Sequence, residues 1–466
     1  MADKEIVVID QSDEDESNLD YNMKLLRSLR SQHIVDINMV RIVLTIWIAA
    51  AVLAILPAFR ESYSEVEKRD LKKFPKASFS AIVSGDYFDE IGLWFSDTFP
   101  LRDGFVALNT NITNMFGINT VQVHGEIEEG DDIPDVVEPE EQVEDLQDGE
   151  DAQQNVTEPE PQQPAVEQLG AMLIVDNAAY EYYNFSQSAA DIYVAAVNRA
   201  SAILDGKSKV YDMIIPTSMA ITLPDSFNGS TNSSDQKKAI DYMYSRILPS
   251  VDKVDVYSTL MAHKNEYIYF RTDHHWTSLG AYYAYRDLMT SKGATAAELS
   301  VFTEQRFEGF LGSFYAESGQ KASLGNTPDY VVAYEPTQVK EMHTFTSSGE
   351  RNYAVIANGD KLSAANKYLT FLCGDHPYSI LSNPTITDGS SCLVIKESFG
   401  NALVPYLTQN YQNVYVVDYR YISQVFPGTL RQFVDERGIG DVIFINNISA
   451  TRSTALVNAL NTFVGQ

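Results

Sequence analysis

The chain has 466 residues, 44% of them hydrophobic, so it is long enough for more than one domain and too apolar to be wholly disordered. Its formal net charge of −30 is local: residues 126–167 hold 17 acidic residues and no Lys or Arg, residues 1–20 carry a net −7, and the rest carries only −6. No basic field is left that would indicate a nucleic-acid partner.

The first predicted elements are a polar tail and a membrane anchor. Residues 1–38 begin acidic and contain short apolar runs, which predicts a loosely ordered cytoplasmic tail. Residues 42–59 are 18 uncharged residues between Arg41 and Arg60, close to the roughly 20 residues that a helix needs to cross a bilayer. We therefore predict one uncleaved transmembrane helix over residues 39–60. The positive charges on its two sides do not decide its orientation.

Two segments separate this anchor from the main domain. Residues 61–124 place Phe88, Ile91 and Phe95 at roughly helical spacing, which predicts a juxtamembrane helical segment that packs beside the membrane. Residues 125–169 are rich in Glu, Asp, Gln and Pro and lack the apolar residues that a core requires. They are predicted to form an acidic, disordered linker that is dispensable for folding.

Residues 170–466 alternate strand and helix patterns, which is typical of an α/β sheet. Strands are predicted at 210–217, 254–260, 391–396, 413–420 and 441–447, and helices at 236–247, from 277 or 278 to about 289, from 401, up to 438 and from about 450. Residues 300–365 contain many turn formers and predict a β-rich insertion. Cys373 and Cys392 lie in apolar runs, which indicates buried thiols and leaves a disulfide between them open.

The densest cluster of ionisable side chains lies at residues 271–276, between a predicted strand end at 267–270 and a predicted helix start. In an extended backbone Asp273 and His275 share one face, so the carboxylate can orient the imidazole as a general base. The intervening His274 is then expected to point to the opposite side. A packed, hydrogen-bonded His beside a Trp is the alternative interpretation.

A second pattern places a candidate nucleophile at Ser398. This Ser follows an apolar run and precedes a predicted helix from Asn401, so it lies at the carboxyl end of a strand. The free N–H groups and the positive dipole of the helix start are expected to stabilise an oxyanion there. A simple helix cap is the alternative role for Ser398. The residues offer the parts of a Ser-His-Asp triad without showing that they meet.

These segments resemble the DHHW protein family of Gram-positive bacteria, through RTDHHWT, IKESFGN and VVDYRY and through SEVEKRDLKKFP and FSDTFPLRD upstream. That family is similar to the SGNH-like domains of alginate-type polysaccharide O-acetyltransferases, in which an Asp-x-His pair precedes the serine. The resemblance covers residues 60–120 and 170–466. It implies a three-layer α/β/α SGNH-hydrolase-like domain with Ser398, His275 and Asp273 as catalytic residues.

Three residues near the expected triad are further candidates for the site. Gly374 follows an apolar run and is the first candidate for a second oxyanion donor, with Asn401 next and Arg271 as a substrate-binding residue. The alternative roles are structural: Gly374 as a turn residue and Asn401 as a polar group of the first helix turn. The chain departs from the wider superfamily in one respect, because Lys396-Glu397-Ser398 stands where that superfamily has Gly-Asp-Ser.

The function implied by the resemblance is that of a membrane-anchored O-acetyltransferase or esterase with its C-terminal domain outside the cytoplasm. Its expected substrate is a cell-envelope or exported polysaccharide, and its expected acyl donor is a multi-pass membrane acyltransferase, without a cofactor or metal.

Two other functions stay open on the sequence. One is a non-catalytic envelope scaffold or glycan-binding module. The other is a metal-dependent hydrolase whose zinc ligands would be Asp273, His274 and His275, with Asp375 or His376.

Overall fold

The structure is a computed structural model that describes residues 41, 45, 63–64, 69–77, 86–99, 122–125, 127–136, 170–227 and 231–465. The chain divides into two units, residues 1–106 and 107–466. In the first unit, β1 (Tyr63–Ser64) and β2 (Arg69–Asp70) form an antiparallel pair, and α3 spans Asp86–Asp97 within the predicted juxtamembrane segment.

The predicted transmembrane helix at 39–60 lies outside the described residues, apart from Arg41 and Thr45. Within the described part of the chain, no helix is both long and apolar enough to cross a membrane.

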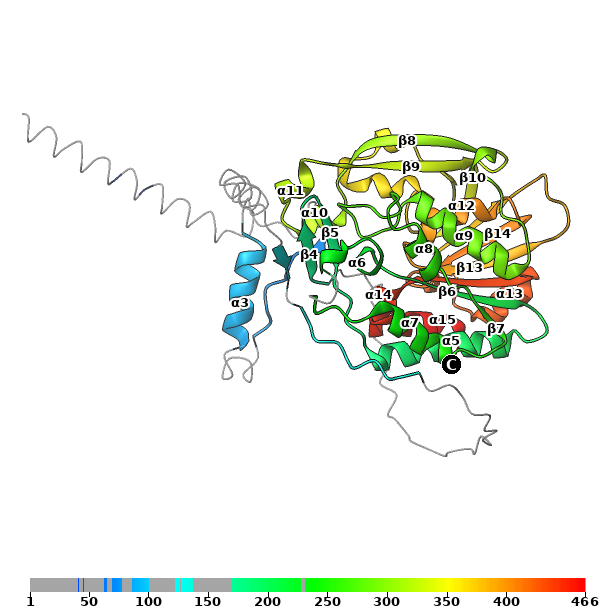
Figure 1. Cartoon of the computed structure of the whole chain (residues 1–466), viewed down its shortest axis with the longest axis horizontal. Coiled ribbons are helices and arrows are strands. Elements are labelled where there is room, and N and C mark those ends of the chain that lie inside the picture. The colour runs from blue at the N-terminus through cyan, green and yellow to red at the C-terminus, as the bar shows by residue number, and fades with distance from the viewer. Residues whose placement is uncertain are drawn as a thin grey trace, which may run out of the picture. The chain divides into compact units, whose positions relative to one another are not determined.

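The second unit is built on an eight-stranded sheet with the order β11-β10-β12-β14-β13-β15-β6-β7 (Figure 1). Its parallel strands are β14 (Asn413–Asp418), β13 (Ser391–Lys396), β15 (Asp441–Asn447), β6 (Lys209–Ile215) and β7 (Val251–Lys253). Three antiparallel strands extend it: β12 (Tyr378–Ser382), β10 (Glu341–Thr346) and β11 (Gly349–Ala354). Every residue of β13 and β15 is buried, as expected for parallel strands covered on both faces.

Helices cover both faces of this sheet (Figure 1). One core contains residues of α5 (Gln187–Ile203), α7 (Gln236–Arg246), α13 (Leu430–Arg437) and α15 (Thr454–Val464). The other contains residues of α8 (Tyr257–Ala262), α9 (Ser278–Lys292) and α12 (Gly400–Leu407), with the antiparallel pair β8 (Phe302–Phe310) and β9 (Asp329–Pro336). Because neighbouring strand residues point to opposite faces, Val210 joins the first core and Tyr211 the second. The sheet of the second unit therefore lies between two packed layers, which is the predicted three-layer α/β/α arrangement.

Smaller elements complete the second unit. A three-stranded antiparallel sheet contains β3 (Gln122–His124), β4 (Met172–Val175) and β5 (Ala178–Glu181). The short α-helices are α6 (Ser218–Ile221), α10 (Ser313–Glu317), α11 (Ala322–Gly325) and α14 (Ile448–Thr451). The short 3-10 helices are η2 (Asp225–Phe227), η3 (Leu299–Val301), η4 (Gly359–Lys361), η5 (Ala364–Thr370) and η6 (Ile422–Gln424).

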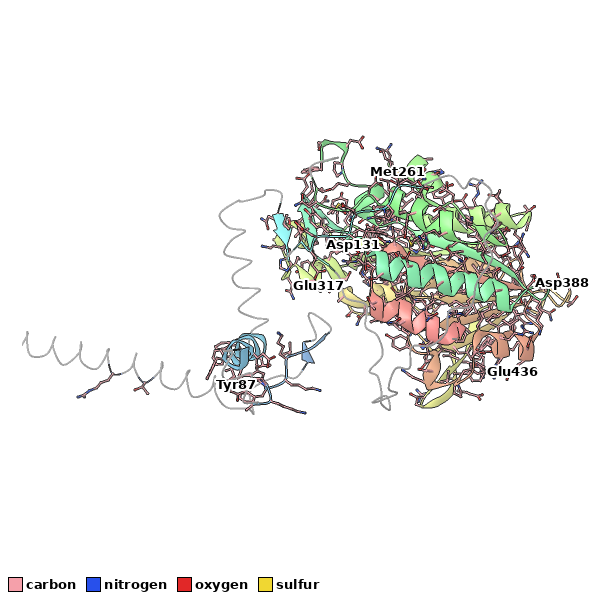
Figure 2. All side chains as sticks on the ribbon, turned by 90° about the horizontal axis from the view of Figure 1, so that it is seen from below. Tyr87, Asp131, Met261, Glu317, Asp388 and Glu436 are labelled. Atoms are coloured by element: carbon pink, nitrogen blue, oxygen red, sulfur yellow. The ribbon has the colours of Figure 1, made fainter. Side chains whose placement is uncertain are left out.

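Residues 127–136, within the predicted acidic linker, lie along the α/β domain. The Asp131 N–H donates to the carbonyl of Phe185 at 2.7 Å, and its carboxylate accepts from the Gln187 N–H at 2.8 Å. Ile133 packs against one of the cores, and Figure 2 labels Asp131 at the domain surface. The first part of the segment is therefore ordered against the domain, contrary to the prediction of a disordered linker, while its dispensability for folding stays a prediction.

The structure bears on three further local predictions, of which the first is wrong. Residues 254–260 are not a strand, because β7 ends at Lys253 and α8 begins at Tyr257. In the region 300–365, β8 and β9 pair with each other, whereas β10 and β11 extend the main sheet. Both cysteines are free thiols.

Candidate active site

The loop that carries the ionisable cluster is a tight turn, whereas the prediction assumed an extended backbone at Asp273–His275. Tyr269 and Trp276 form an isolated antiparallel bridge, and the Phe270 N–H donates to the carbonyl of His275. The buried Trp276 donates from its indole N–H to the carbonyl of Phe399 at 3.0 Å. The loop is therefore anchored directly to the residue that follows Ser398.

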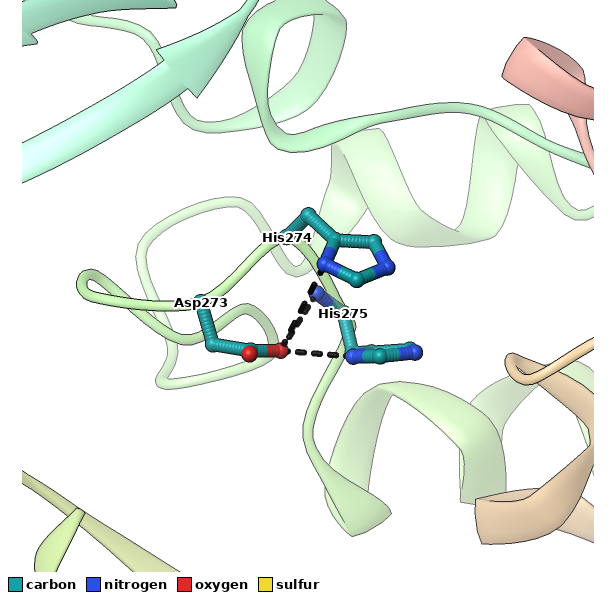
Figure 3. A group of neighbouring side chains, drawn as sticks. All are labelled: Asp273, His274 and His275. Atoms are coloured by element: carbon teal, nitrogen blue, oxygen red, sulfur yellow. Dashed lines mark hydrogen bonds and ion pairs between the residues drawn. The ribbon is translucent and has the colours of Figure 1, made fainter. Parts of the chain in front are cut away.

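Both carboxylate oxygens of Asp273 accept hydrogen bonds. Its Oδ1 accepts from His275 Nδ1 at 2.6 Å and from the His275 N–H at 3.0 Å (Figure 3). Its Oδ2 accepts from the Ser313 N–H at 2.9 Å and the Ser313 hydroxyl at 3.1 Å. Gly312 makes this approach possible, because a Cβ at that position would lie 2.2 Å from Oδ2.

The environment of Asp273 favours a carboxylate. Burial opposes ionisation, but the imidazoles of His275 and His274 and the Ser313 N–H outweigh it and hold the pKa of Asp273 well below its usual range. A stable carboxylate beside His275 Nδ1 fixes the tautomer in which Nε2 is free to accept a proton.

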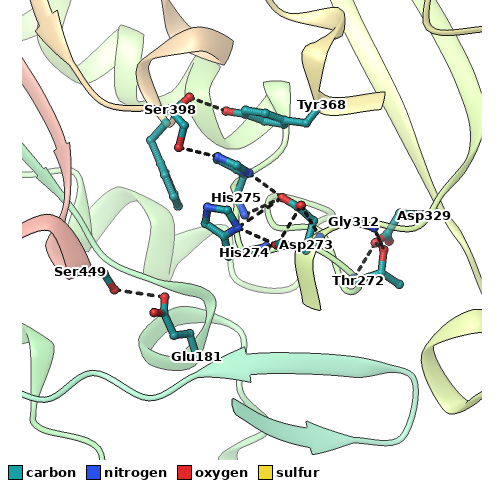
Figure 4. A network of polar contacts seen from close by, with 12 residues as sticks. Glu181, Thr272, Asp273, His274, His275, Gly312, Asp329, Tyr368, Ser398 and Ser449 are labelled. Carbon is teal, nitrogen blue, oxygen red and sulfur yellow. Dashed lines mark hydrogen bonds and ion pairs between the residues drawn. The ribbon is translucent and has the colours of Figure 1, made fainter. Parts of the chain in front are cut away.

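The structure brings Ser398 to His275, as the family resemblance implies. Ser398 lies between β13 and α12, and its hydroxyl is 2.8 Å from His275 Nε2 (Figure 4). With the 2.6 Å contact from Nδ1 to Asp273, this gives a continuous hydrogen-bond chain from carboxylate to imidazole to hydroxyl. This is the geometry that activates a serine nucleophile.

Glu397 is a neighbour of Ser398, the candidate nucleophile, and was not assigned to the site from the sequence. Its Oε2 accepts from the Ser398 hydroxyl at 3.1 Å and from the Phe399 N–H at 2.9 Å, and its Oε1 accepts from the Asn447 N–H at 2.7 Å. The fully buried carboxylate thus ties the nucleophile turn to the end of β15. The single Ser398 hydroxyl proton has two acceptors within reach, His275 and Glu397.

His274 does not point away from the site, contrary to the prediction. Because the backbone turns here, its ring centroid lies 3.8 Å from that of His275, with an interplanar angle of 37° (Figure 3). Its Nδ1 lies 2.7 Å from the Ser313 hydroxyl, which also contacts Asp273. The two histidines therefore share one hydrogen-bonded cluster.

The sequence predicts free backbone N–H groups at the helix start after Ser398, but in the structure these groups are already bonded. The Phe399 N–H donates to Glu397 Oε2, the Gly400 N–H to the carbonyl of Glu397, and the Asn401 N–H to the carbonyl of Ser398. These three donors are used within the turn itself, so the expected oxyanion site at the start of α12 is not formed by them.

Gly374 is also occupied, because its N–H donates to the carbonyl of Phe371 at 3.0 Å. It closes a strained turn in which Leu372, Cys373 and Gly374 have φ values of +55°, +54° and +98°. This geometry does not support the prediction that Gly374 supplies an oxyanion donor.

The other two predicted binding residues have structural partners. Asn401 Nδ2 donates to Asp375 Oδ1 at 2.8 Å. Arg271 Nε donates to Asp329 Oδ1 at 2.9 Å, and its backbone N–H donates to the other oxygen of the same buried carboxylate. Both side chains therefore brace neighbouring loops in this structure.

A charge cluster lies beside the turn that carries Ser398, and three of its members, Lys396, Asp418 and Arg420, are buried. Lys396 Nζ lies 2.9 Å from Asp375 and 3.0 Å from Asp418, and Arg420 contacts the same two carboxylates. Burial opposes ionisation of Asp375, but Lys396 and Arg420 keep its pKa well below the usual range. Because Asp375 also accepts from Asn401, the cluster joins the end of β13 to the first turn of α12.

Asp273, His274 and His275 offer ligand atoms that lie within 4.8 Å of one another, so their donor types fit the open alternative of a metal site. In the described region these atoms hydrogen-bond to each other, Ser313 and Ser398. Asp375 pairs with Lys396 and Arg420 instead of joining them.

The family model described as "DHHW protein" matches residues 67–148 and 143–417. The chain belongs to the DHHW protein family. A search of the curated proteins found no match.

Several solved structures match this DHHW protein over most of their own length. A DHHW family protein from Eubacterium siraeum is 26% identical with a TM-score of 0.55, and the match covers 63% of this chain and 94% of that one. Bacillus cereus PatB1 with a sulfonyl adduct is 16% identical with a TM-score of 0.51, covering 61% and 97%. The O-acetyltransferase domain of Pseudomonas putida AlgJ is 13% identical with a TM-score of 0.32, covering 62% and 96%.

Proposed function

We propose that this DHHW protein is a membrane-anchored, extracytoplasmic O-acyltransferase or esterase that acts on a cell-envelope or exported polysaccharide. The observation that carries the proposal is the continuous hydrogen-bond chain from Asp273 through His275 to Ser398. The fold that it shares with PatB1, whose solved structure carries a sulfonyl adduct, supports an SGNH-like active site.

The first half of the proposed reaction forms an acyl-serine. Ser398 Oγ attacks the acyl carbonyl carbon, and its proton passes to His275 Nε2. Asp273 stabilises the resulting imidazolium through the 2.6 Å contact to Nδ1. The tetrahedral intermediate then collapses, the leaving group takes the proton from Nε2, and the acyl group stays on Ser398.

The second half returns the enzyme to its starting state. A sugar hydroxyl or a water molecule gives its proton to His275 Nε2 and attacks the acyl carbon. The bond to Ser398 Oγ breaks, and Oγ recovers the proton from the imidazolium. A sugar acceptor yields an O-acylated glycan, and water yields the free acid, so the acceptor alone distinguishes transferase from esterase.

The test uses the full-length chain, because β3 and residues 127–136 contribute contacts to the domain. The protein is incubated with p-nitrophenyl acetate, acetate release is followed, and acetyl-Ser398 is sought by mass spectrometry. Ser398→Ala and His275→Ala are each expected to lower turnover by about 10³-fold or more. Ser391→Ala is the matched control, since Ser391 lies at the other end of the same strand.

Each alternative function predicts a different result. Acylation of Ser398 that requires His275 supports the proposal, and acetyl transfer to added oligosaccharide would define a transferase. Turnover that disappears with EDTA and returns with zinc would favour the metal-dependent hydrolase. A folded protein that binds glycan without any acylation of Ser398 would establish the non-catalytic module instead.

The anchor and the acyl donor are part of the same proposal. The uncharged run at 42–59 would hold the domain at the outer surface, where a multi-pass membrane acyltransferase would deliver acyl groups from a cytoplasmic donor. Protease added to intact protoplasts is expected to digest the C-terminal domain. Complete protection of that domain would overturn the assigned orientation.

A further inference from the structure

Tyr368, in η5, contacts both reacting members of the triad. Its ring stacks on the imidazole of His275 with centroids 3.6 Å apart and an interplanar angle of 12°. Its hydroxyl donates to the carbonyl oxygen of Ser398 at 3.1 Å (Figure 4). A single buried side chain therefore touches the base with its ring and the nucleophile backbone with its hydroxyl.

The imidazole of His275 is covered on both faces. The ring of His274 lies 3.8 Å from that of His275, and Tyr368 lies at 3.6 Å. One face of an imidazole holds only one ring at such distances, so the two neighbours lie on opposite faces. Rotation of His275 out of the plane that joins Asp273 to Ser398 would collide with one of them.

Stacking of a tyrosine on a histidine does not by itself indicate function. Tyr283 of α9 stacks on His263 with centroids 3.7 Å apart and an angle of 16°, and both residues are partly exposed. Tyr368 differs because it joins the base and the nucleophile. Its ring is itself held by Phe371, 5.3 Å away, and by Phe270, 6.2 Å away.

We propose that Tyr368 is a positioning residue of the active site, which holds His275 and Ser398 in register and stabilises the imidazolium formed when Ser398 attacks. This inference rests on the proposed function. The aromatic face of Tyr368 carries negative charge density, so a cation on His275 is attracted to it more strongly than neutral imidazole. The stack therefore favours the charged state that forms during reaction over the resting state.

Two substitutions separate the ring from the hydroxyl. Tyr368→Phe keeps the aromatic face and loses the bond to the Ser398 carbonyl, whereas Tyr368→Leu loses both. The pre-steady-state rate of Ser398 acylation by p-nitrophenyl acetate is measured for the full-length chain, together with kcat, KM and the melting temperature. Tyr283→Leu is the matched control, because it removes a similar stack from a histidine outside the site.

We expect Tyr368→Leu to slow acylation by about 10–30-fold with KM little changed, and Tyr368→Phe to stay within about 5-fold of the parent. Tyr283→Leu is expected to leave the rate unchanged. Rescue by Phe is the decisive readout, since loss of packing alone would lower the melting temperature without selectively slowing acylation.

The outcomes separate this inference from the function on which it rests. If the Leu and Phe variants both acylate Ser398 as fast as the active parent, Tyr368 has no positioning role and the inference is overturned. A parent that shows no acylation of Ser398 would overturn the proposed function and this inference with it. A loss in Tyr368→Leu that Phe does not restore would also overturn the role assigned to the aromatic face.

Discussion

Two buried aspartates in the same domain show how the site differs from the core. Asp273 in the candidate site is 4% exposed, and Asp212 in the middle of β6 is 0% exposed. Asp273 has donors on both oxygens. Asp212 accepts from the Tyr193 hydroxyl at 2.5 Å on Oδ1, and its Oδ2 has no hydrogen-bond partner among the described residues.

Because of this difference in partners, the pKa values of the two aspartates shift in opposite directions, although burial raises both. Burial raises the pKa of Asp212 to about 7, and the bond from Tyr193 only partly offsets it. Burial also opposes ionisation of Asp273, but His275, His274 and Ser313 hold its pKa well below the usual range. Low exposure therefore does not determine whether an aspartate is charged. Of these two residues, only Asp273 is surrounded by groups that keep its side chain ionised beside His275.

The largest effect is expected from Asp273→Asn. An amide keeps the shape but favours the wrong tautomer of His275 and cannot stabilise its cation, so turnover should fall by about 10³–10⁴-fold. The same substitution at Asp212 is the matched control, since it changes a buried carboxylate outside the site. Esterase rates of both variants, measured above pH 7 after a check of folding, test this contrast. Similar losses in both variants would remove the distinction.

Gly312→Ala tests the surroundings of Asp273 without changing any ionisable group. The new Cβ would lie 2.2 Å from Oδ2 and 2.3 Å from the Cβ of Asp273, so the carboxylate must move. We expect turnover to fall by roughly 10–100-fold, because small displacements in a triad are costly. Gly440→Ala is the control, since its Cβ would meet only the Ser391 carbonyl at 3.5 Å. A Gly312→Ala enzyme as active as Gly440→Ala would show that Asp273 tolerates displacement.

The central part of the fold and site follows from local sequence patterns. The buried runs at β6, β13, β14 and β15 are nearly continuous, and Ser398 stands at a strand end before a helix. Asp273 and His275 are only two residues apart, so they can meet in this turn as they would on one face of a strand. Parallel strands and a crossover helix then explain how Ser398, the candidate nucleophile after β13, lies at the edge of the sheet near the loop.

The supporting residues could not be predicted in the same way, because they come from distant parts of the chain. Ser313 and Asp273 are 40 residues apart, and Tyr368 and Ser398 are 30 apart. Their meeting depends on how the loops cross the sheet edge, which no local periodicity encodes. The orientation of His274 was predicted wrongly for a related reason: the i, i+2 rule holds for a strand, and this segment is a turn.

The smallest effect on turnover, and a distinct effect on stability, is expected from Asp212→Asn. In the wild type the pKa of Asp212 rises on folding, from its ordinary value of 3.8 to about 7. The folded state therefore binds more protons than the unfolded state between about pH 4 and pH 7, and stability falls as pH increases through that window. Asn cannot ionise, so the free energy of unfolding of the variant, relative to wild type, should rise by on the order of 1–3 kcal/mol across the window and level off above it. Denaturant unfolding at pH 4.5, 6 and 8 measures the difference. A difference that does not depend on pH would mean that Asp212 is ionised in the fold despite its burial, and the contrast with Asp273 would then lie in catalysis alone.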